Sequence, residues 1–346
     1  PILMFMFSIG GATFGMSEEA IAFVAVLMPL VLALGYDSIV AVAITYLACN
    51  LGFSAAMLNP FTVGIAQSIA GIQLYSGVEF RTLVWFVSTL VGCGFVMFYA
   101  MKIKKNPELS PMFEHDQVKR EKLKSTESEH TEFTLRHKII IAALFTSIAL
   151  VVYGVLKLEF WIPQIAAVFL GLGIISGLVG KLAPNEIAEA FTAGAKDMIG
   201  AAIMIGLAKS VMIIAQNANI IDTILFNLAN VVGQLPSLIA SYIMFVIQMF
   251  INFFVSSGSG QAALTMPILA PLGDLVGISR QLSVLIYQLG DGFSNAMFPT
   301  SGVLIACLGM AGVPYGKWLK WILPLQAILF MTAIVFITIA SLIGWA

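Results

Sequence analysis

The sequence predicts an all-α integral membrane protein built from two related halves, and three observations support this fold class. Hydrophobic residues make up 60% of the 346 residues and charged residues only 10%, whereas about a quarter of the residues of a soluble domain are charged. The charges are also concentrated, because nine of the 17 Lys and Arg residues lie within residues 102–138. Finally, one six-residue motif occurs twice. Long apolar segments with few charges are typical of chains that span a membrane.

The first two apolar segments are too short to cross a membrane. Residues 2–8 and 20–34 flank a Gly-rich, polar stretch at residues 10–19, and a membrane-spanning helix needs about 20 apolar residues. The two arms therefore predict a re-entrant hairpin, which enters and leaves the membrane on one side and has the Gly-rich stretch at its tip.

A broken helix is expected next. Residues 38–57 form a full-length apolar segment that is interrupted at Leu58-Asn59-Pro60 and resumes over residues 61–71. Proline removes a backbone donor, so the helix is expected to break there and to leave carbonyl groups in need of partners. Residues 82–101 then predict an ordinary span.

The second half repeats this order after a polar linker. Residues 256–261 lie between an apolar segment and a short arm at residues 262–276, which predicts a second hairpin. Residues 282–297 run into a second break, Phe298-Pro299-Thr300-Ser301-Gly302, and the helix resumes to residue 312. The remaining predicted elements are spans at residues 139–156, 161–180, 198–215, 237–255 and 318–343, an amphipathic helix at 184–196 and an interfacial helix at 220–232.

The two halves match in sequence as well as in order. Gly-Phe-Ser-Ala-Ala-Met at residues 52–57 and Gly-Phe-Ser-Asn-Ala-Met at residues 292–297 agree at five of six positions. Three apolar residues after each break match at the same offset, and a Met-Pro pair recurs in the second arm of each hairpin. Several features in register predict an internal repeat, because chance would give only an isolated match among apolar segments.

The charges predict that the two repeats are inverted. Basic residues place the linker on the inside, so the first hairpin enters from the inside, the second enters from the outside, and the two broken helices are antiparallel. The predicted division is a first-repeat region at residues 1–101, a cytoplasmic linker at 102–138 and a second repeat at 139–346. The second half has three spans before its hairpin and the first has none, so we expect N-terminal scaffold helices to be missing from this chain.

Inverted repeats with broken helices are the design of secondary transporters. The chain carries no nucleotide-binding motif, so we expect an ion gradient or exchange to supply the energy, and we expect no cofactor and no nucleic-acid partner. An enzyme is not expected, although an intramembrane protease that uses Asp37 and Asp291 is one alternative. A serine protease would need a His, and all three His residues lie in the linker. A channel is a further alternative.

Two stretches resemble a known family. Residues 55–67 (Ala-Ala-Met-Leu-Asn-Pro-Phe-Thr-Val-Gly-Ile-Ala-Gln) and residues 256–267 (Ser-Ser-Gly-Ser-Gly-Gln-Ala-Ala-Leu-Thr-Met-Pro) resemble the C4-dicarboxylate anaerobic carrier family of the ion transporter superfamily, especially its YfcC-type branch of basic amino acid antiporters. The resemblance covers the whole chain. It implies a scaffold domain, a moving transport domain with two hairpins, elevator-type alternating access, a homodimer and a location in the bacterial cytoplasmic membrane.

The resemblance also bears on the coupling ion. Relatives in the superfamily place Ser-Asn-Thr motifs at their substrate and sodium sites. The corresponding positions here resemble Leu58-Asn59-Pro60 and Pro299-Thr300-Ser301, so this chain departs from that motif. Na+ at the helix breaks, H+ and a counter-substrate all remain open as the coupled species.

Residues at the two helix breaks are the first candidates for the site. Asn59, Thr62, Thr300 and Ser301 combine side-chain oxygens with freed carbonyl groups and half-helix N-termini, which can bind a substrate or a cation at mid-membrane. Alternatively, these residues only satisfy the broken backbone. The breaks occur at matched positions, which favours the functional interpretation.

The hairpin tips supply the second group of candidates. Gly258 and Gly260 would let the backbone of the second tip approach a ligand closely. A carboxylate inside a membrane is costly and usually functional, although acidic residues also favour the start of a helix. The candidates are Ser256, Ser257, Ser259 and Gln261 at the second tip and Ser17, Glu18 and Glu19 at the first.

Asp291 is the best single candidate for a charged contact. It lies inside an apolar span directly before Gly-Phe-Ser, whereas the matching residue of the first half is Leu51. We expect Asp291 to bind the positive part of a substrate, a coupling cation or a proton, with Asn295 as a polar partner. Lys209 lies in the middle of a predicted span, where it either pairs with an acid or binds a carboxylate. The predicted substrate is a small amino acid, preferably basic, and a C4-dicarboxylate is the alternative.

Overall fold

The computed structural model describes residues 1–126, 134–158, 160, 162–218, 223 and 232–346, and all regular elements within these ranges are helices. The interfacial helix predicted at residues 220–232 lies almost entirely outside them. The chain forms two compact units, one of residues 1–118 and 201–346 and the other of residues 119–200. In the smaller unit, α8 (Leu135–Lys157) packs against α9 (Ile162–Val179).

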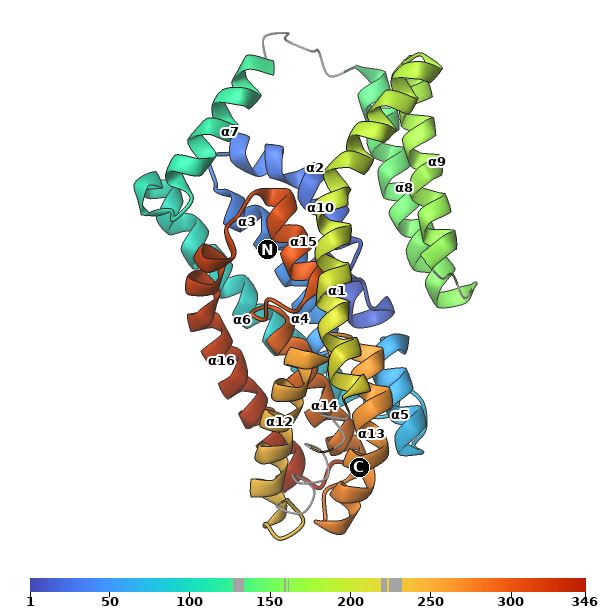
Figure 1. Ribbon diagram of the computed structural model, residues 1–346, viewed down its shortest axis with the longest axis vertical. Coiled ribbons are helices and arrows are strands. Elements are labelled where there is room, and N and C mark those ends of the chain that lie inside the picture. Colours follow the sequence, from blue (N-terminus) through green and yellow to red (C-terminus); the bar gives the residue numbers. More distant parts are fainter. Residues whose placement is uncertain (127–133, 159, 161, 219–222, 224–231) are drawn as a thin grey trace. The chain divides into compact units, whose positions relative to one another are not determined.

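The larger unit contains the two predicted series of helices (Figure 1). The first series is α1 (Ile2–Phe14), α2 (Ala20–Ala33), α3 (Ser38–Val42), the π-helical turn η1 (Ala43–Leu47), α4 (Ala48–Ser54), the π-helical turn η2 (Pro60–Gly64), α5 (Ile65–Ala70) and α6 (Val78–Lys105). The second is α12 (Ser237–Phe254), α13 (Gly258–Leu275), α14 (Arg280–Asn295), α15 (Gly302–Ala311) and α16 (Tyr315–Leu342). Each series therefore has two helical arms, a helix that ends at a break, a short second half-helix and a long helix.

The larger unit contains long apolar helices that are suited to crossing a membrane. Within the described ranges, α6, α12 and α16 are long and apolar enough to cross a membrane, and they match the spans predicted at residues 82–101, 237–255 and 318–343. On α16, for example, Leu325 is buried whereas Met331 is 60% exposed. Large apolar side chains that point away from the protein are expected where lipid is the solvent.

The two helices that carry Gly-Phe-Ser run antiparallel. In η1, which leads directly into α4, the Tyr46 hydroxyl donates to the carbonyl oxygen of Asn295 at the end of α14 at 3.0 Å. Later along α4, the carbonyl oxygen of Phe53 accepts a hydrogen bond from Gln288 Nε2 at 3.3 Å. Residue numbers thus rise along η1–α4 while they fall along α14, which is the relation that the predicted inversion requires.

The second arm of each series packs against both series. In the first series α1 packs against α4, and in the second α12 packs against α14. The second arms contact their own series, with α2 against α3 and α13 against α14, and also the other series, with α2 against α15 and α13 against α5. The long helices α6 and α16 also contact each other (Figure 1). The two series are therefore packed together through both of their second arms.

Glycines allow α1 and α4 to approach each other closely. A Cβ atom on Gly11 would collide with the carbonyl oxygen of Cys49, and one on Gly52 would collide with the carbonyl oxygen of Ser8. The prediction that Gly10 and Gly11 belong to a polar break was therefore wrong, since α1 continues to Phe14. These glycines serve backbone-to-backbone packing, and the turn between the arms is confined to residues 15–19.

Three other boundaries differ from the sequence prediction. The predicted helices at residues 184–196 and 198–215 are one helix, α10 (Pro184–Asn217), because a change in polarity alone does not end a helix. The linker contains the short helix η3 (Pro107–Leu109) and α7 (Phe113–Thr126). At the second hairpin the turn is shorter than expected, since Gly258 already begins α13.

The linker is bound to the first series by two buried carboxylates. The Asp116 carboxylate on α7 accepts hydrogen bonds from the backbone N–H of Ser38 at 2.7 Å and from its hydroxyl at 2.6 Å. Asp37 caps the start of α3 by accepting from the Val40 N–H at 2.9 Å, and it also accepts from the Ser110 hydroxyl at 2.6 Å. Both carboxylates thus stabilise the same helix N-terminus.

Candidate functional site

The first helix break lies between α4 and η2 and is held by the end of α1. The backbone N–H groups of Met57 and Leu58 donate to the carbonyl oxygen of Ala12 at 3.1 and 3.0 Å. The Asn59 side chain accepts from the Phe61 N–H at 2.9 Å and so caps the half-helix that follows. Asn59 is fully buried, and its Nδ2 atom has no hydrogen-bond partner among the described residues.

The turn between α1 and α2 lies against this break. Gly15 has φ +77°, a left-handed conformation that favours glycine, and an added Cβ atom would lie 2.7 Å from Asn59 Oδ1. The Ser17 N–H donates to the Glu19 carboxylate at 3.1 Å. Glu18 is exposed, while Ser17 and Glu19 are half-buried. The two acidic residues directly precede α2, where a helix N-terminus favours negative charge.

At the second break, side chains from α16 and η1 donate hydrogen bonds to most of the backbone carbonyl groups that the break leaves free. The donors are Trp318 Nε1 to Ala296 at 2.9 Å, the Tyr315 hydroxyl to Met297 at 2.7 Å, Gln326 Nε2 to Phe293 at 2.6 Å and the Tyr46 hydroxyl to Asn295 at 3.0 Å. These bonds leave fewer carbonyl groups for a ligand than the sequence suggested.

The turn between α12 and α13 is joined to the second break. The Ser256 hydroxyl donates to the carbonyl oxygen of Thr300 at 2.7 Å. The Thr300 hydroxyl is buried and has no partner within the described ranges. Ser301, which is also buried, precedes α15 without forming a side-chain cap. The spare polar atom of this break is therefore the Thr300 hydroxyl.

Asp291 on α14 is the centre of the candidate site. Its side chain is 0% exposed, and neither carboxylate oxygen has a hydrogen-bond partner in the described part of the chain. An ionised carboxylate that is buried without a partner costs several kcal/mol. A group of this kind must either hold a proton or receive a cation.

The surroundings of Asp291 come from both series of helices. A Cβ atom added to Gly258 at the start of α13 would lie 3.3 Å from Asp291 Oδ2, 2.7 Å from Thr62 Cγ2 and 2.9 Å from the Phe53 ring. The Tyr287 hydroxyl donates to the Gly258 carbonyl oxygen at 2.6 Å and so fixes this turn to α14. The Thr62 hydroxyl is buried and, like Asp291, has no partner among the described residues. Two spare oxygen-bearing side chains therefore meet at one glycine.

Asn295 and its neighbours form a packing contact between helices. Asn252 Nδ2 on α12 lies 2.8 Å from the Asp291 carbonyl oxygen, 2.7 Å from the Ser294 hydroxyl and 2.9 Å from Asn295 Oδ1. Asn295 is thus hydrogen-bonded within the protein, which favours the structural interpretation of this candidate. Asn252 was not predicted, although Gln248 and Asn252 stand one helical turn apart in an apolar span, which is a readable signal.

The other candidates of the second turn are also engaged within the protein. Gln261 Nε2 donates to the Gln248 carbonyl oxygen at 2.9 Å and to its side chain at 2.8 Å, which ties α13 to α12. Ser257 caps α13 by accepting from the Gly260 N–H. Ser259 is half-buried in the first turn of α13. Gln261 and Ser257 therefore stabilise the contact between α12 and α13 and the start of α13 whether or not a ligand binds.

Arg81 is a buried basic residue that the sequence analysis missed. It is 1% exposed, and its Nη1 atom donates to Gln288 Oε1 at 2.9 Å and its Nη2 atom to Gln281 Oε1 at 3.3 Å. It directly precedes the predicted span at residues 82–101, and a basic side chain at such an edge usually extends to water. The structure has α6 begin at Val78, so Arg81 lies inside the helix.

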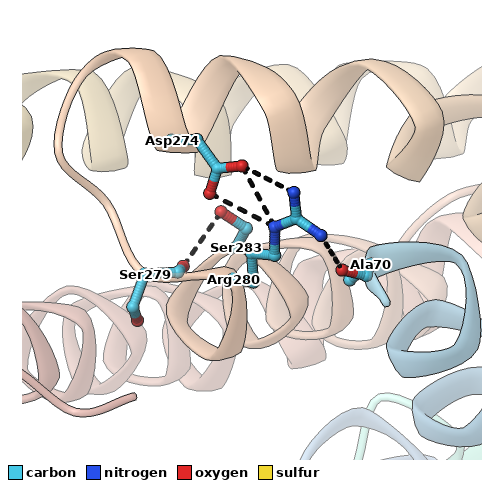
Figure 2. A network of polar contacts seen from close by, with 5 residues as sticks. All are labelled: Ala70, Asp274, Ser279, Arg280 and Ser283. Atoms are coloured by element: carbon cyan, nitrogen blue, oxygen red, sulfur yellow. Dashed lines mark hydrogen bonds and ion pairs between the residues drawn. The ribbon is translucent and has the colours of Figure 1, made fainter. Parts of the chain in front are cut away.

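Arg280 illustrates a charge with a structural role. Its guanidinium binds the Asp274 carboxylate, with Nη2 2.8 Å from Oδ2, and its Nη1 atom donates to the carbonyl oxygen of Ala70 at 2.6 Å (Figure 2). In the same network the Ser283 hydroxyl donates to the carbonyl oxygen of Ser279 (Figure 2). The pair is about two-fifths exposed. It connects the corner between α13 and α14 to the end of α5.

The structure describes the side chain of only one of the two remaining candidates, Lys209 and Asp37. The side chain of Lys209 lies outside the described part of the chain, so its role stays a prediction. Asp37, the partner that an intramembrane aspartyl protease would require, uses its carboxylate to cap α3 and to bind the linker.

The sequence and the fold are similar to those of known membrane transporters. A family model described as the C4-dicarboxylate anaerobic carrier matches residues 1–342. The chain is 42% identical over 356 residues to the Escherichia coli K12 protein named "Putative basic amino acid antiporter YfcC", covering 100% of this chain and 70% of that protein. It is also 35% identical over 325 residues to an uncharacterized protein of Haemophilus influenzae, covering 93% of this chain and 64% of the relative.

The fold is similar to a solved transporter structure. The crystal structure of the YdaH transporter of Alcanivorax borkumensis, described as revealing an unusual topology, aligns with a TM-score of 0.54 over 99% of this chain and 78% of that chain, at 18% identity. With helices that match this fold and a family match over nearly the whole sequence, the chain is an integral membrane transporter and not an enzyme. It belongs to the C4-dicarboxylate anaerobic carrier family.

Proposed function

We propose that this protein is a secondary active transporter that moves a small, preferably basic, amino acid across the bacterial cytoplasmic membrane by alternating access. The observation that carries this proposal is Asp291, a fully buried carboxylate with no partner in the described residues. Its burial cost is offset when a cation binds, and the ammonium or guanidinium group of a basic amino acid supplies such a cation. The name of the Escherichia coli relative is consistent with this substrate class.

The helix breaks are proposed to complete the binding site. The spare hydroxyl groups of Thr62 and Thr300 and the side chain of Asn59 are free to contact a substrate or a coupling ion. Na+ favours such neutral oxygen ligands beside a carboxylate, whereas H+ would need Asp291 alone. We propose that the other candidates shape the site or the access to it, in addition to the hydrogen bonds that several of them make within the protein. These residues are Ser17, Glu18, Glu19, Ser256, Ser257, Ser259, Gln261, Asn295 and Ser301.

We further propose the inverted topology, with the first hairpin reached from the inside and the second from the outside. It is supported by the antiparallel Gly-Phe-Ser helices and by the basic residues of the linker. The division at residues 1–101, 102–138 and 139–346, the elevator motion between a scaffold and a transport domain, and the homodimer remain parts of this proposal.

Accessibility of single cysteines tests the topology. Gly15 and Gly258 are poor positions, because a Cβ atom at either would lie within 3.0 Å of a neighbouring side chain. Ser17→Cys and Ser259→Cys are nearly isosteric and lie at half-buried positions in the same two turns. We expect a membrane-impermeant thiol reagent to label Ser17→Cys only from the inside and Ser259→Cys only from the outside. Labelling of both from one side in every state would contradict the inversion.

Counterflow of labelled substrate tests the transport mode. In proteoliposomes that contain the full-length protein, we expect saturable uptake of labelled lysine, driven by unlabelled lysine, arginine or ornithine on the other side. Flux that does not saturate and shows no counterflow would indicate a channel instead. Counterflow of succinate without counterflow of lysine would establish the C4-dicarboxylate alternative and overturn the amino acid assignment.

A further inference from the structure

The buried charge of Arg81 lacks an acidic partner. No Asp or Glu carboxylate among the described residues lies within 4.0 Å of its guanidinium. Its two recorded hydrogen bonds go to neutral amide oxygens, and its Nε atom is buried without a partner. A guanidinium has five N–H donors and is always charged in proteins. Arg81 therefore keeps spare donors and an unneutralised positive charge.

The environment of Arg81 is built from polar side chains of several elements. Gln67 on α5 donates to Gln281 Oε1 at 3.3 Å, and Gln281 in turn donates to the Ser76 hydroxyl. The Trp345 ring lies with its centroid 5.4 Å from the Arg81 guanidinium carbon. This arrangement holds the guanidinium in one orientation and covers it with an aromatic ring.

Gln288 connects this cluster to Asp291. It accepts a hydrogen bond from Arg81 and stands three residues before Asp291 on α14, which places the two side chains on the same face of the helix, one turn apart. Its amide group also donates to the carbonyl oxygens of Phe53 and Ala56, at 3.3 and 3.4 Å. This face of α14 thus carries the buried Asp291 and, one turn away, the amide of Gln288 that binds the buried Arg81 of α6. The two opposite charges do not form an ion pair.

We propose that Arg81 is the anion subsite of the transport site and receives the carboxylate of the substrate, with Gln288 moving aside, while Asp291 receives the distal cationic group of the same molecule. This inference rests on the proposed function and specifies its substrate class. A ligand that neutralises both charges carries a cation and an anion. Because Gln288 lies between the two subsites, the two poles are separated by a chain of several bonds, as in lysine, ornithine or arginine.

Other ligand classes satisfy only one of the two charges. A dicarboxylate would be attracted to Arg81 and repelled by Asp291, while a diamine would be attracted to Asp291 and repelled by Arg81. In a short amino acid such as glycine the two charged groups are attached to one carbon, so we expect it to reach only one of the two side chains. The proposed pair of subsites therefore predicts a preference for basic over small neutral amino acids.

Calorimetric titration of three probes into the full-length protein in detergent tests the proposal. Lysine carries both poles, cadaverine lacks the carboxylate, and ε-aminocaproate keeps both poles but lacks the α-amino group. We expect wild-type protein to bind lysine and ε-aminocaproate at least about tenfold more tightly than cadaverine, which is the usual contribution of a charge-assisted hydrogen bond. Equal affinity for lysine and cadaverine would overturn the proposal without any variant.

Substitution of Arg81 provides the second arm. We expect Arg81→Gln to weaken lysine and ε-aminocaproate about tenfold to a hundredfold, and to leave cadaverine unchanged or tighter, because the repelling charge is gone. Arg81→Lys keeps the charge without the fork of donors and should fall between the two. If Arg81→Gln weakens all three probes equally, or none of them, Arg81 has only a structural role and the proposal is wrong.

The failure of the anion subsite and the failure of the proposed function give different results. If wild-type protein binds succinate and neither lysine nor cadaverine, the amino acid assignment fails. Loss of succinate binding in Arg81→Gln would then still support the anion subsite, and retained succinate binding would overturn it as well.

Discussion

Asp291→Asn is expected to reduce the affinity for lysine, arginine and ornithine about a hundredfold while the protein remains folded. The substitution keeps the shape of the side chain and removes its charge. Truncating one member of a buried charge pair costs about 2–5 kcal/mol of binding free energy. Folding is expected to be unaffected or improved, because the carboxylate has no partner in the described residues whose loss would be felt.

Binding calorimetry and thermal unfolding of the same preparations separate the two effects. Asp274→Asn is the matched control, because Asp274 belongs to an exposed ion pair with Arg280, about two-fifths exposed. We expect this control to keep wild-type affinity and nearly wild-type stability, since exposed pairs contribute little.

A second outcome for Asp291→Asn would identify proton coupling. If Asp291 carries the coupling proton, exchange of substrate survives in the variant and the pH dependence of net uptake becomes flat. A variant that retains wild-type affinity, coupling and pH profile would show that Asp291 is structural, and the basic amino acid assignment would lose its main support.

Gly52→Ala is expected to destabilise the protein by more than about 3 kcal/mol, which is at the upper end of overpacking effects. The added methyl group would collide with the backbone carbonyl oxygen of Ser8, which cannot turn aside as a flexible side chain would. Since Gly52 lies where α4 crosses α1, the two helices must separate. The end of α1 binds the first break through Ala12, so the site is expected to be disturbed together with the fold.

Thermal unfolding in detergent checks this expectation, with Gly94→Ala as the control. Gly94 also lies within a helix, but an added Cβ atom there has no neighbour within 4 Å. Alanine favours the helix by roughly 0.5–1 kcal/mol over glycine, so this variant should unfold at the wild-type temperature or slightly above it. A wild-type unfolding temperature for Gly52→Ala would refute the close crossing of α1 and α4.

The Gly-Phe-Ser repeat relates the two substituted positions, because Gly52 begins the motif in the first half and Asp291 directly precedes it in the second half. The Gly-Phe-Ser motif places Gly52 at the contact with α1 and Gly292 at a contact with Ser54, where an added Cβ atom would also collide. The same residue type thus permits two close helix crossings, one of α4 with α1 within the first series and one of α14 with α4 between the two series. The charge at the site is not repeated, because Leu51 stands where the second half has Asp291.

Sequence and structure agree on features that are encoded locally. Apolar length identifies the spans that α6, α12 and α16 form, and Pro60 together with the Phe298–Gly302 stretch marks the two breaks to within a few residues. Boundaries were less accurate where one residue type has two uses. Gly10 and Gly11 were assigned to a break because glycine interrupts helices in isolation, whereas here glycine is needed for packing against α4.

The sequence by itself determined the membrane class, the internal repeat, the two breaks and Asp291 as an isolated charge, because each of these follows from hydropathy or a motif along the chain. Only the tertiary structure decided which polar atoms have partners. Gln261 and Asn295 are engaged by α12, and Thr62 and Thr300 keep spare hydroxyl groups. The role proposed for Arg81 could come only from the tertiary structure, since its partners Gln281 and Gln288 are 200 or more residues away in the sequence. Contacts at such separations arise from how helices pack, which no local pattern specifies.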